Sequence, residues 1–236
     1  MSSDISIIIP TYQHASTLTA CLDSVLAQTL PPAEIIVVDD GSTDNTRTVL
    51  APYKAKGVII IEQTNQGSNR ARNVGFDRTK SPYVLFLDAD IVMKPGMLEK
   101  LLRVLKSDAT AAYAYSGFRF GWKQFKSFPF SRERLRKMNY VHTSALIRRE
   151  WFPRFDEEVK RFQDWDVWLS ILQKGGRGVY VPEELFHVRV GHGRQGISSW
   201  RPSGLYRLPW KLFGWTPRSV RAYESARDAI IHKHGL

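Results

Sequence analysis

The sequence has a single cysteine, no long apolar run and no phosphate loop of the GxxxxGK[ST] type. Cys21 alone excludes an internal disulfide and every metal site built from several cysteines, and it favours a reducing, cytoplasmic setting. Without a run of about eighteen apolar residues, an ordinary transmembrane helix is excluded. Residues 1–4 carry no basic segment ahead of an apolar core, so we expect no signal peptide. GxxxxGK[ST] does not occur, and GxGxxG occurs only at 191–196, far from the alternating strands and helices of the first half, which argues against an NTPase or a dehydrogenase.

Charge is unevenly distributed along the 236 residues, whose formal net charge is +11. Residues 1–100 hold 9 basic and 11 acidic side chains, and residues 101–236 hold the other 25 and 12. A basic excess favours an anionic partner, which can be a nucleic acid, a phospholipid headgroup or a phosphorylated substrate. Charge alone does not choose among these partners, but its asymmetry indicates two tasks within one chain.

The first half alternates between short apolar runs and segments with helical periodicity. Runs that are apolar on both faces and alternate with helices are typical of a parallel α/β sheet. We predict strands at 5–9, 35–38, 58–61 and 84–87, and helices at 16–28, 43–50, 68–78 and 96–106. Beyond residue 110 the pattern weakens to strands near 111–115 and 141–147, a basic surface segment at 132–138, and helices at 164–174 and 219–234.

Three of the predicted strands end in polar clusters. Ligands bind at the carboxyl ends of strands in open parallel sheets, so clusters that share this edge predict a ligand site. The cluster at 39–42, taken alone, would be an ordinary turn with a helix cap. The clusters are Pro10-Thr11-Tyr12, Asp39-Asp40-Gly41-Ser42 and Asp88-Ala89-Asp90.

Asp88 and Asp90 are spaced so that both carboxylates can project to one side of the strand end. Carboxylates held close together raise each other's pKa unless a cation lies between them. A divalent metal bound through few protein oxygens, with substrate phosphates completing its shell, suits this pair. The alternative is a solvated acidic loop.

Four segments resemble the signature blocks of family 2 glycosyltransferases, in that family's order, over about the first hundred residues. They are Ile-Ile-Ile-Pro-Thr-Tyr at 7–12, Val-Val-Asp-Asp-Gly-Ser-Thr-Asp at 37–44, Asn-Gln-Gly at 65–67 with Ala-Arg-Asn-Val-Gly at 71–75, and Phe-Leu-Asp-Ala-Asp at 86–90. The resemblance implies the GT-A fold, an α/β fold whose mostly parallel central sheet is flanked by helices. It also implies a nucleotide-sugar donor, Mg²⁺ or Mn²⁺ at the D-x-D motif, and inversion at the anomeric carbon. A UDP-sugar is favoured by the resemblance only; thymidine and guanosine donors stay open.

The resemblance also implies roles for individual residues. Asp40 would hydrogen-bond the base, Asp90 would be the main metal ligand, and Asp88 would contact the ribose or a metal-bound water. The donor site as a whole would be formed by Pro10, Thr11, Tyr12, Asp39, Asp40, Gly67, Arg72, Asn73, Asp88 and Ala89.

One further block, Phe-Gln-Asp-Trp-Asp-Val-Trp-Leu at 162–169, resembles the family's Glu-Asp segment below the acceptor site. Gln163 stands where the family usually has glutamate, so Asp164 is the candidate general base that deprotonates the acceptor hydroxyl. The alternative for Asp164 is a helix N-cap, and Asp166 is the second candidate base. A third metal ligand is expected at His192 or at His187, with His192 preferred.

The resemblance suggests a division into a nucleotide-sugar and metal-binding half at 1–110, an acceptor and base half at 111–200, and a basic aromatic segment at 201–236. This segment could lie on an anionic membrane, which would place a cytoplasmic protein at the inner face of the plasma membrane, or pack its aromatic residues on the sheet. We therefore expect a carbohydrate or lipid-linked acceptor and cell-envelope polysaccharide or glycolipid synthesis. The alternative functions are a catalytically inactive scaffold of the same family and a nucleic-acid-binding protein, but no nucleic-acid module is recognisable.

Overall fold

A single nine-stranded sheet runs through the computed structural model, which describes residues 4–125, 127–189, 210 and 216–236. The strand order is β3-β2-β1-β4-β8-β6-β9-β5, and β7 pairs with β6 outside this path. The strands are β1 (Ile5–Thr11), β2 (Glu34–Asp39), β3 (Ile59–Glu62), β4 (Tyr83–Phe86), β5 (Ile91–Met93), β6 (Tyr113–Phe120), β7 (Lys123–Phe125), β8 (Leu146–Arg148) and β9 (Gly178–Val188).

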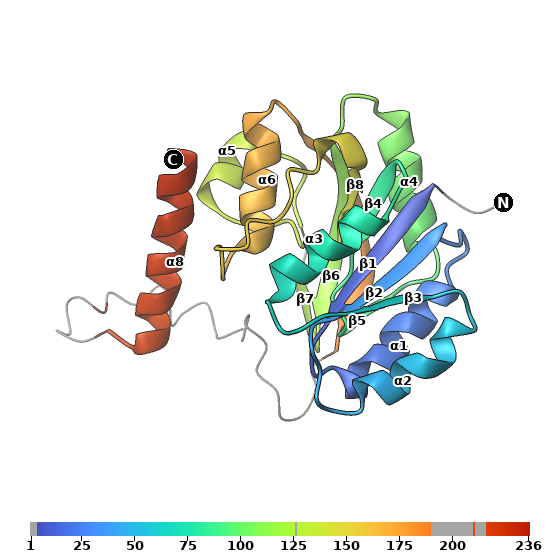
Figure 1. The fold of residues 1–236 in the computed structure, drawn as a ribbon. Helices are drawn as coiled ribbons and strands as arrows, with labels where there is room; N and C mark the ends of the chain where they lie inside the picture. The colour runs from blue at the N-terminus through green and yellow to red at the C-terminus, as the bar shows by residue number, and fades with distance from the viewer. Residues whose placement is uncertain (1–3, 126, 190–209, 211–215) are drawn as a thin grey trace.

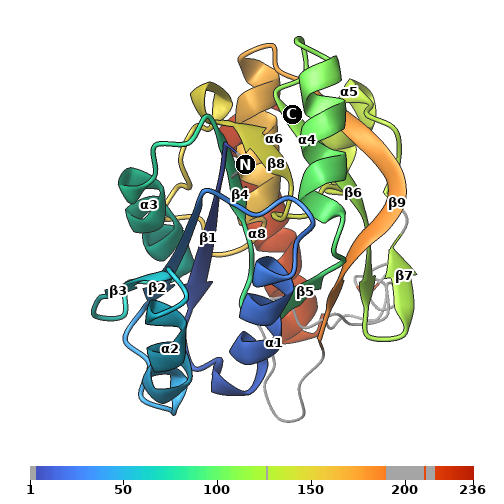
Figure 2. The same cartoon turned by 90° about the vertical axis from the view of Figure 1, so that its right-hand side faces the viewer.

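Helices cover both faces of this sheet (Figure 1). The face bearing α1, α2 and α4 is turned to the viewer in Figure 2, and α6 and α8 lie behind the sheet. Among the described residues, no helix is long and apolar enough to span a membrane. The described α-helices are α1 (Ala15–Leu26), α2 (Thr46–Lys54), α3 (Ser68–Arg78), α4 (Met97–Ser107), α5 (Arg132–Lys137), α6 (Gln163–Gln173) and α8 (Arg218–His234).

Successive side chains of a strand point to opposite faces of the sheet, so the core is divided between these two faces. In β1, Ile7 and Ile9 pack with α1, α2 and α4 in one cluster, whereas Ile8 points to the other face and packs with aromatic side chains of α6. All seven residues of β1 are buried, which explains its continuous apolar run. The second cluster centres on Trp165 and Trp168, whose indole N–H groups donate to the carbonyls of Leu135 and Val141.

The predicted α/β class is confirmed, and the parallel character is concentrated in the first half. β1 pairs in parallel with β2 and β4, and β2 with β3, as the alternating pattern predicts. In the second half β8 runs antiparallel to β4 and β6, while β9 runs parallel to β6 and antiparallel to β5. The structure corrects the rest: 132–137 is a helix, the strand expected at 141–147 is confined to 146–148, and the sequence did not predict the strands at 91–93, 123–125 and 178–188.

Candidate functional site

The carboxyl ends of the first parallel strands meet at one edge of the sheet, the lower edge in Figures 1 and 2. Thr11, the last residue of β1, lies opposite Asp39, the last residue of β2, and the Asp40 N–H donates to the Thr11 carbonyl over 2.8 Å. The Leu87 N–H donates to the Ile8 carbonyl over 2.9 Å, which places the segment after β4 beside them. The three polar clusters therefore share one edge, as the topology predicts.

Asp40 organises the loop that leads into α3. Its carboxylate is buried and accepts hydrogen bonds from the Gln63 side chain at 2.7 Å and from the Gln66 and Gly67 N–H groups, both at 2.8 Å. Asp39, also buried, accepts from the Ser42 N–H at 3.0 Å. The expected contact of Asp40 with a base would have to coexist with these bonds, so that assignment stays a prediction.

The other predicted donor residues line the same edge. Pro10, Thr11 and Ala89 are buried, and Tyr12 is 37% exposed. The Thr11 hydroxyl is buried without a hydrogen-bond partner among the described residues, and such an unsatisfied polar group favours a ligand contact. Gly67 has φ +94°, a conformation that few residues other than glycine adopt, where the chain enters α3.

Arg72 connects the predicted donor and acceptor sides. Its guanidinium is buried, donates to Asp88 Oδ1 over 2.7 Å and donates to Gln163 Oε1 over 3.0 Å. A third bond, to Asn69 Oδ1, spans 3.2 Å. The amide oxygen of Gln163 therefore occupies the position in which a glutamate would pair with Arg72.

Asn73 lies next to Arg72 in sequence but has a different setting. Its side chain donates to the Phe155 carbonyl over 2.8 Å and accepts from the Phe155 N–H over 3.0 Å. Asn73 therefore fastens α3 to the loop that precedes α6. Its expected place beside the nucleotide remains a prediction, because both polar atoms of its amide already have backbone partners.

The surroundings of Asp88 and Asp90 shift the pKa values of their carboxyl groups in opposite directions. Burial alone would raise the pKa of Asp88, but the Arg72 guanidinium and then His142 hold it below its usual value. Burial and the Asp88 charge raise the pKa of Asp90 to about 7. A half-buried carboxylate with a raised pKa beside a charged one is a setting that a divalent cation stabilises, so this pair fits Mg²⁺ or Mn²⁺.

The fit to a metal rests on these two residues alone. Among the residues that the structure describes, no group of three or more histidines, cysteines or acids could hold a metal ion. His187 lies in β9 opposite Val92 and belongs to no such group, while His192 lies outside the described residues. Any further ligands would have to come from the donor phosphates, from water or from residues such as His192.

Asp164 lies in the first turn of α6 and is half-buried. Burial raises its pKa, and the opposing effects of His142 and of a hydrogen bond with Asn139 only reduce that rise. Its Oδ1 accepts from the Trp165 N–H at 2.9 Å, whereas the expected N-cap position belongs to Phe162, whose side chain makes no capping bond. A carboxylate with a raised pKa suits a base that takes a proton near neutral pH.

Asp166, the second candidate base, is held elsewhere. It is 3% exposed, its Oδ1 lies 2.7 Å from His234 Nε2 and 2.8 Å from Lys233 Nζ, and both partners belong to α8. Residues two apart on an α-helix project about 200° from one another, so Asp164 and Asp166 face different directions. The structure thus assigns Asp166 to the packing of α8.

His142 is a site residue that sequence reasoning missed. It is electrostatically coupled to both Asp88 and Asp164, and burial lowers its pKa. Its ring packs at an angle against the stacked rings of Phe118 and Phe186, with centroid distances of 4.9 and 5.0 Å, and its Nδ1 accepts from the Ser144 N–H at 3.1 Å. The sequence carried no sign of this role, because His142 fell within a strand expected at 141–147 and lies instead in the loop before β8.

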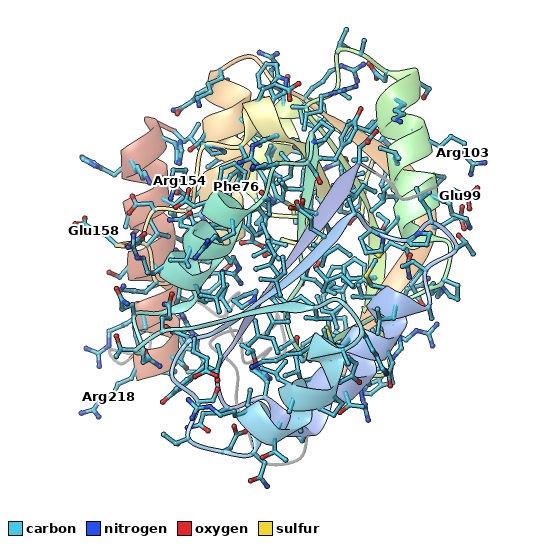
Figure 3. All side chains as sticks on the ribbon, turned by 45° about the vertical axis from the view of Figure 1, so that its right-hand side comes forward. Phe76, Glu99, Arg103, Arg154, Glu158 and Arg218 are labelled. Atoms are coloured by element: carbon cyan, nitrogen blue, oxygen red, sulfur yellow. The ribbon has the colours of Figure 1, made fainter. Side chains whose placement is uncertain are left out.

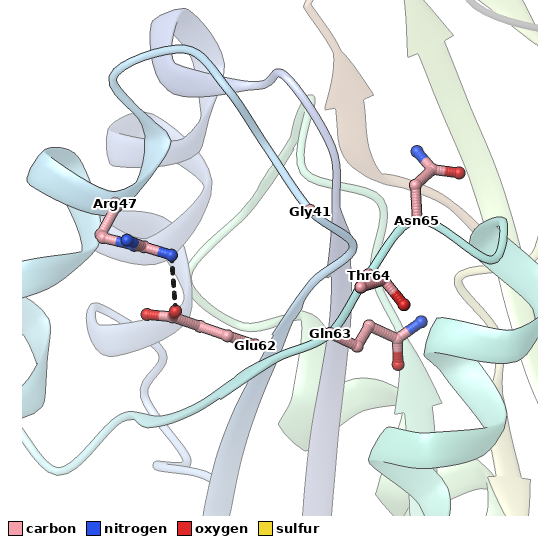
Figure 4. Close-up of a pocket in the computed structure, with 6 residues that line it drawn as sticks. All are labelled: Gly41, Arg47, Glu62, Gln63, Thr64 and Asn65. Carbon is pink, nitrogen blue, oxygen red and sulfur yellow. Dashed lines mark hydrogen bonds and ion pairs between the residues drawn. The ribbon is translucent and has the colours of Figure 1, made fainter.

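An open pocket of about 490 Å³ lies at the outer side of the same edge (Figure 4). Arg47 and Glu62 form an ion pair across it at 2.7 Å. Gln63, which also lines the pocket, donates to Asp40 and so connects the pocket to the predicted base-binding loop. The lining contains none of Asp88, Asp90 and Asp164, so we do not place the chemistry there. It is formed by Gly41, Arg47, Glu62, Gln63, Thr64 and Asn65.

Comparisons with known proteins agree with this geometry. The chain is 44% identical over 109 residues to an uncharacterized glycosyltransferase of Nostoc sp., covering 44% of this chain and 33% of the relative. It is 29% identical over 211 residues to the putative teichuronic acid biosynthesis glycosyltransferase TuaG of Bacillus subtilis, covering 84% of this chain and 83% of the relative. The chain thus spans about a third of the first relative and most of the second.

Among solved structures, S. aureus TarS 1–349 in complex with UDP-GlcNAc superposes with a TM-score of 0.73. The sequences are 19% identical, and the match covers 99% of this chain and 71% of that one, which confirms the predicted GT-A fold. The family model for glycosyl transferase family 2 matches residues 6–167, a span that reaches from β1 to the first turn of α6 and includes Asp40, Arg72, Asp88, Asp90 and Asp164. This chain belongs to glycosyl transferase family 2.

Proposed function

We propose that this protein is an inverting glycosyltransferase that moves a sugar from a nucleoside diphosphate sugar to an acceptor hydroxyl. One observation carries the proposal: Arg72 binds both Asp88 of the predicted donor side and Gln163, the neighbour of the predicted base. The buried guanidinium joins the Asp88 carboxylate to the start of α6, the helix that carries Asp164. A UDP-sugar is the favoured donor, supported by the fold shared with TarS, whose structure contains UDP-GlcNAc.

Asp164 would act as the base. Its carboxylate would take the proton of the acceptor hydroxyl while that oxygen forms a bond to the anomeric carbon. The bond from this carbon to the diphosphate oxygen would break on the opposite face, so the configuration would invert in one displacement. Asp90 and Asp88 would hold Mg²⁺ or Mn²⁺, which would stabilise the charge of the leaving diphosphate.

The acceptor proposed here is a carbohydrate or lipid-linked glycan of the cell envelope. The teichuronic acid role named for TuaG supports this acceptor class. We further propose peripheral attachment to an anionic membrane. Most of 201–215 lies outside the described residues, but Trp122 is 87% exposed between β6 and β7, and the exposed residues of α5 are mainly basic.

The first experiment measures release of nucleoside diphosphate from a panel of nucleotide sugars with Mn²⁺, Mg²⁺ or a chelator. We expect release with one donor class, loss of release with the chelator, and a fall of about 10³-fold or more in Asp90→Ala. Asp228→Ala, at an exposed carboxylate of α8, is the matched control. Unchanged release in Asp90→Ala would refute the metal site. A thermal-shift screen identifies the donor, because a ligand of the native state raises its apparent stability.

A vesicle-flotation assay with anionic and neutral vesicles tests attachment. We expect the full chain to float with the anionic vesicles, and a full-length chain that carries Trp210→Ser and Trp215→Ser to float less. Equal flotation of both chains would contradict a role for the C-terminal segment.

A scaffold without catalysis is the second candidate, favoured by Gln163 in place of glutamate. The two functions differ in one measurement: a scaffold binds the nucleotide sugar in the thermal-shift screen and releases no diphosphate.

A further inference from the structure

The helix that carries Asp164 begins with a strained residue. Phe162, directly before α6, has φ 59° and ψ 32°, which is the left-handed region, and no side chain caps the helix there. A bulky aromatic residue adopts this conformation only where surrounding contacts impose it. The Phe162 ring packs edge-on against Trp165 at 5.8 Å and against Tyr223 of α8 at 5.2 Å. One of the contacts that impose this conformation therefore comes from α8.

The same first turn is held from its other side by the end of α8. Asp166 is buried and lies within 2.8 Å of Lys233 Nζ and 2.7 Å of His234 Nε2. A buried carboxylate that loses its partner is strongly disfavoured, so these contacts fix the position of the turn. Further along, the Gln173 side chain donates to the His234 carbonyl over 3.1 Å.

A second route leads from α8 to the donor side. Lys233 Nζ lies 2.6 Å from Asp156 Oδ2, and the Asp156 carbonyl accepts from Asn69 Nδ2 at 2.6 Å. Asn69 Oδ1 in turn accepts from Arg72, the partner of Asp88. Figure 1 shows α8 standing beside α6, outside the layers that cover the sheet. Helix α8, which packs against α6 and places Ile230 in the second core cluster, thus contacts the supports of both carboxylate sites.

We infer that α8 is a positioning element of this enzyme, and that Tyr223, Lys233 and His234 hold the first turn of α6 so that Asp164 meets the acceptor. The inference rests on the proposed function for its catalytic consequence. None of the three residues touches the reacting atoms. Their effect reaches the reaction through Phe162 and Asp166.

The test compares Tyr223→Ala and His234→Gln with the matched control Arg221→Ala, which changes an exposed side chain of the same helix. Misplacing a catalytic group by about 1 Å can cost up to a hundredfold, so we expect kcat to fall about tenfold to a hundredfold in the two variants. The donor KM should stay within about twofold, because the donor site keeps its residues. Tyr223→Phe, which keeps the ring, should restore kcat. Thermal melting checks that each variant is folded, and Tyr223→Leu replaces Tyr223→Ala if the latter does not fold.

Two outcomes would overturn the inference: kcat values equal to that of Arg221→Ala, or a loss that appears in the donor KM and not in kcat. Hydrogen exchange at the amides of 163–167 gives a readout that needs no activity. We expect faster exchange in Tyr223→Ala and His234→Gln than in Arg221→Ala. If the wild-type protein releases no diphosphate, the proposed function is refuted but the inference about α8 is not. The hydrogen-exchange rates then still decide whether α8 holds the first turn of α6. Equal exchange rates in all three variants would refute the inference that α8 holds the first turn of α6.

Discussion

The two halves of the sheet differ in how regularly strands and helices alternate along the chain. In the first half, β1 pairs with β2, and β2 with β3, each through one intervening helix. In the second half β6 pairs with β9, so that Tyr113 lies opposite Gly178, with β7, α5, β8 and α6 in between. The first half also contains a distant pair, since Ile5 of β1 lies opposite Tyr83 of β4, but strands and helices alternate regularly along this half. That regular alternation makes the predicted donor edge recognisable in the sequence, whereas the irregular order of the second half hides the predicted acceptor side.

The largest expected effect lies in the second half. Asp164→Asn removes the proposed base without changing its size, and we expect kcat to fall about 10²-fold to 10⁴-fold. The donor KM should change little, because the proposed donor contacts come from the first half. Steady-state kinetics with saturating acceptor measure both constants, with Asp228→Asn as control. Full turnover in Asp164→Asn would show that the base is another residue. It would also contradict the proposed division into a donor half and an acceptor half.

The next effect falls on the junction between the halves. Arg72→Met leaves the Asp88 carboxylate without its partner. Breaking a buried pair costs about 3–5 kcal/mol, but the Asp88 side chain is 33% exposed, so we expect a loss of about 2 kcal/mol in the free energy of unfolding. Arg70→Met is the control on the same helix, since Arg70 and Glu157 are both more than 40% exposed and their pair contributes less than about 1 kcal/mol. Urea unfolding measures both variants, and equal losses would contradict a special role for Arg72.

A smaller effect tests the close packing of the first half. A methyl group at Gly75 would clash with Ile8 Cγ2 of β1 and lie 3.3 Å from Val38 Cγ2 of β2. Overpacking costs about 1–3 kcal/mol and the helix preference of alanine offsets about 1 kcal/mol, so we expect Gly75→Ala to lower the free energy of unfolding by about 1 kcal/mol. In Gly96→Ala the added methyl group meets only Lys100 at 3.6 Å, so the change should stay within about 1 kcal/mol. A Gly75→Ala variant as stable as Gly96→Ala would show that α3 can move away from the sheet.

The smallest effect concerns pH. Arg154, in the loop before α6, donates to both carboxylate oxygens of Asp77 on α3, over 2.6 and 2.9 Å, and lies beside Phe76 in Figure 3. The hydrogen bond with Arg154 lowers the pKa of Asp77. Because the pKa of Asp77 is lower in the folded protein than in the unfolded chain, its ionised carboxylate stabilises the fold at pH values above the ordinary pKa of about 3.9. This contribution is lost as the pH falls through the lowered pKa.

We therefore expect Asp77→Asn to melt at a slightly lower temperature than wild type near pH 6 and at about the same temperature near pH 2.5. Both side chains are well exposed, so the difference should be small. Differential scanning calorimetry across this range measures it. A difference that persists at low pH would show that the substitution acts through something other than charge.

The sequence predicted the first half well because its physical causes are local. Ile5–Ile9 and Ile35–Val38 are apolar on both faces, and parallel pairing then brings Asp39 and Asp88 to one edge. Strand β9 was missed because Pro182 and two glutamates interrupt its pattern, at a point where the register with β6 shifts around Gly117. His142 was missed because only the folded chain brings its loop beside Asp88 and Asp164.

The contact between α8 and α6 also has a consequence for how the protein is made. Asp166 and His234 are separated by 68 positions in the sequence. A ribosome that adds about 5–20 residues per second delivers α8 several seconds after α6 has been synthesised. The nascent chain therefore passes through a stage in which the donor edge is complete while Phe162 has no Tyr223 to pack against. If α8 holds the base as inferred, the proposed transferase reaches its full rate only once residue 234 has been added and has left the ribosome.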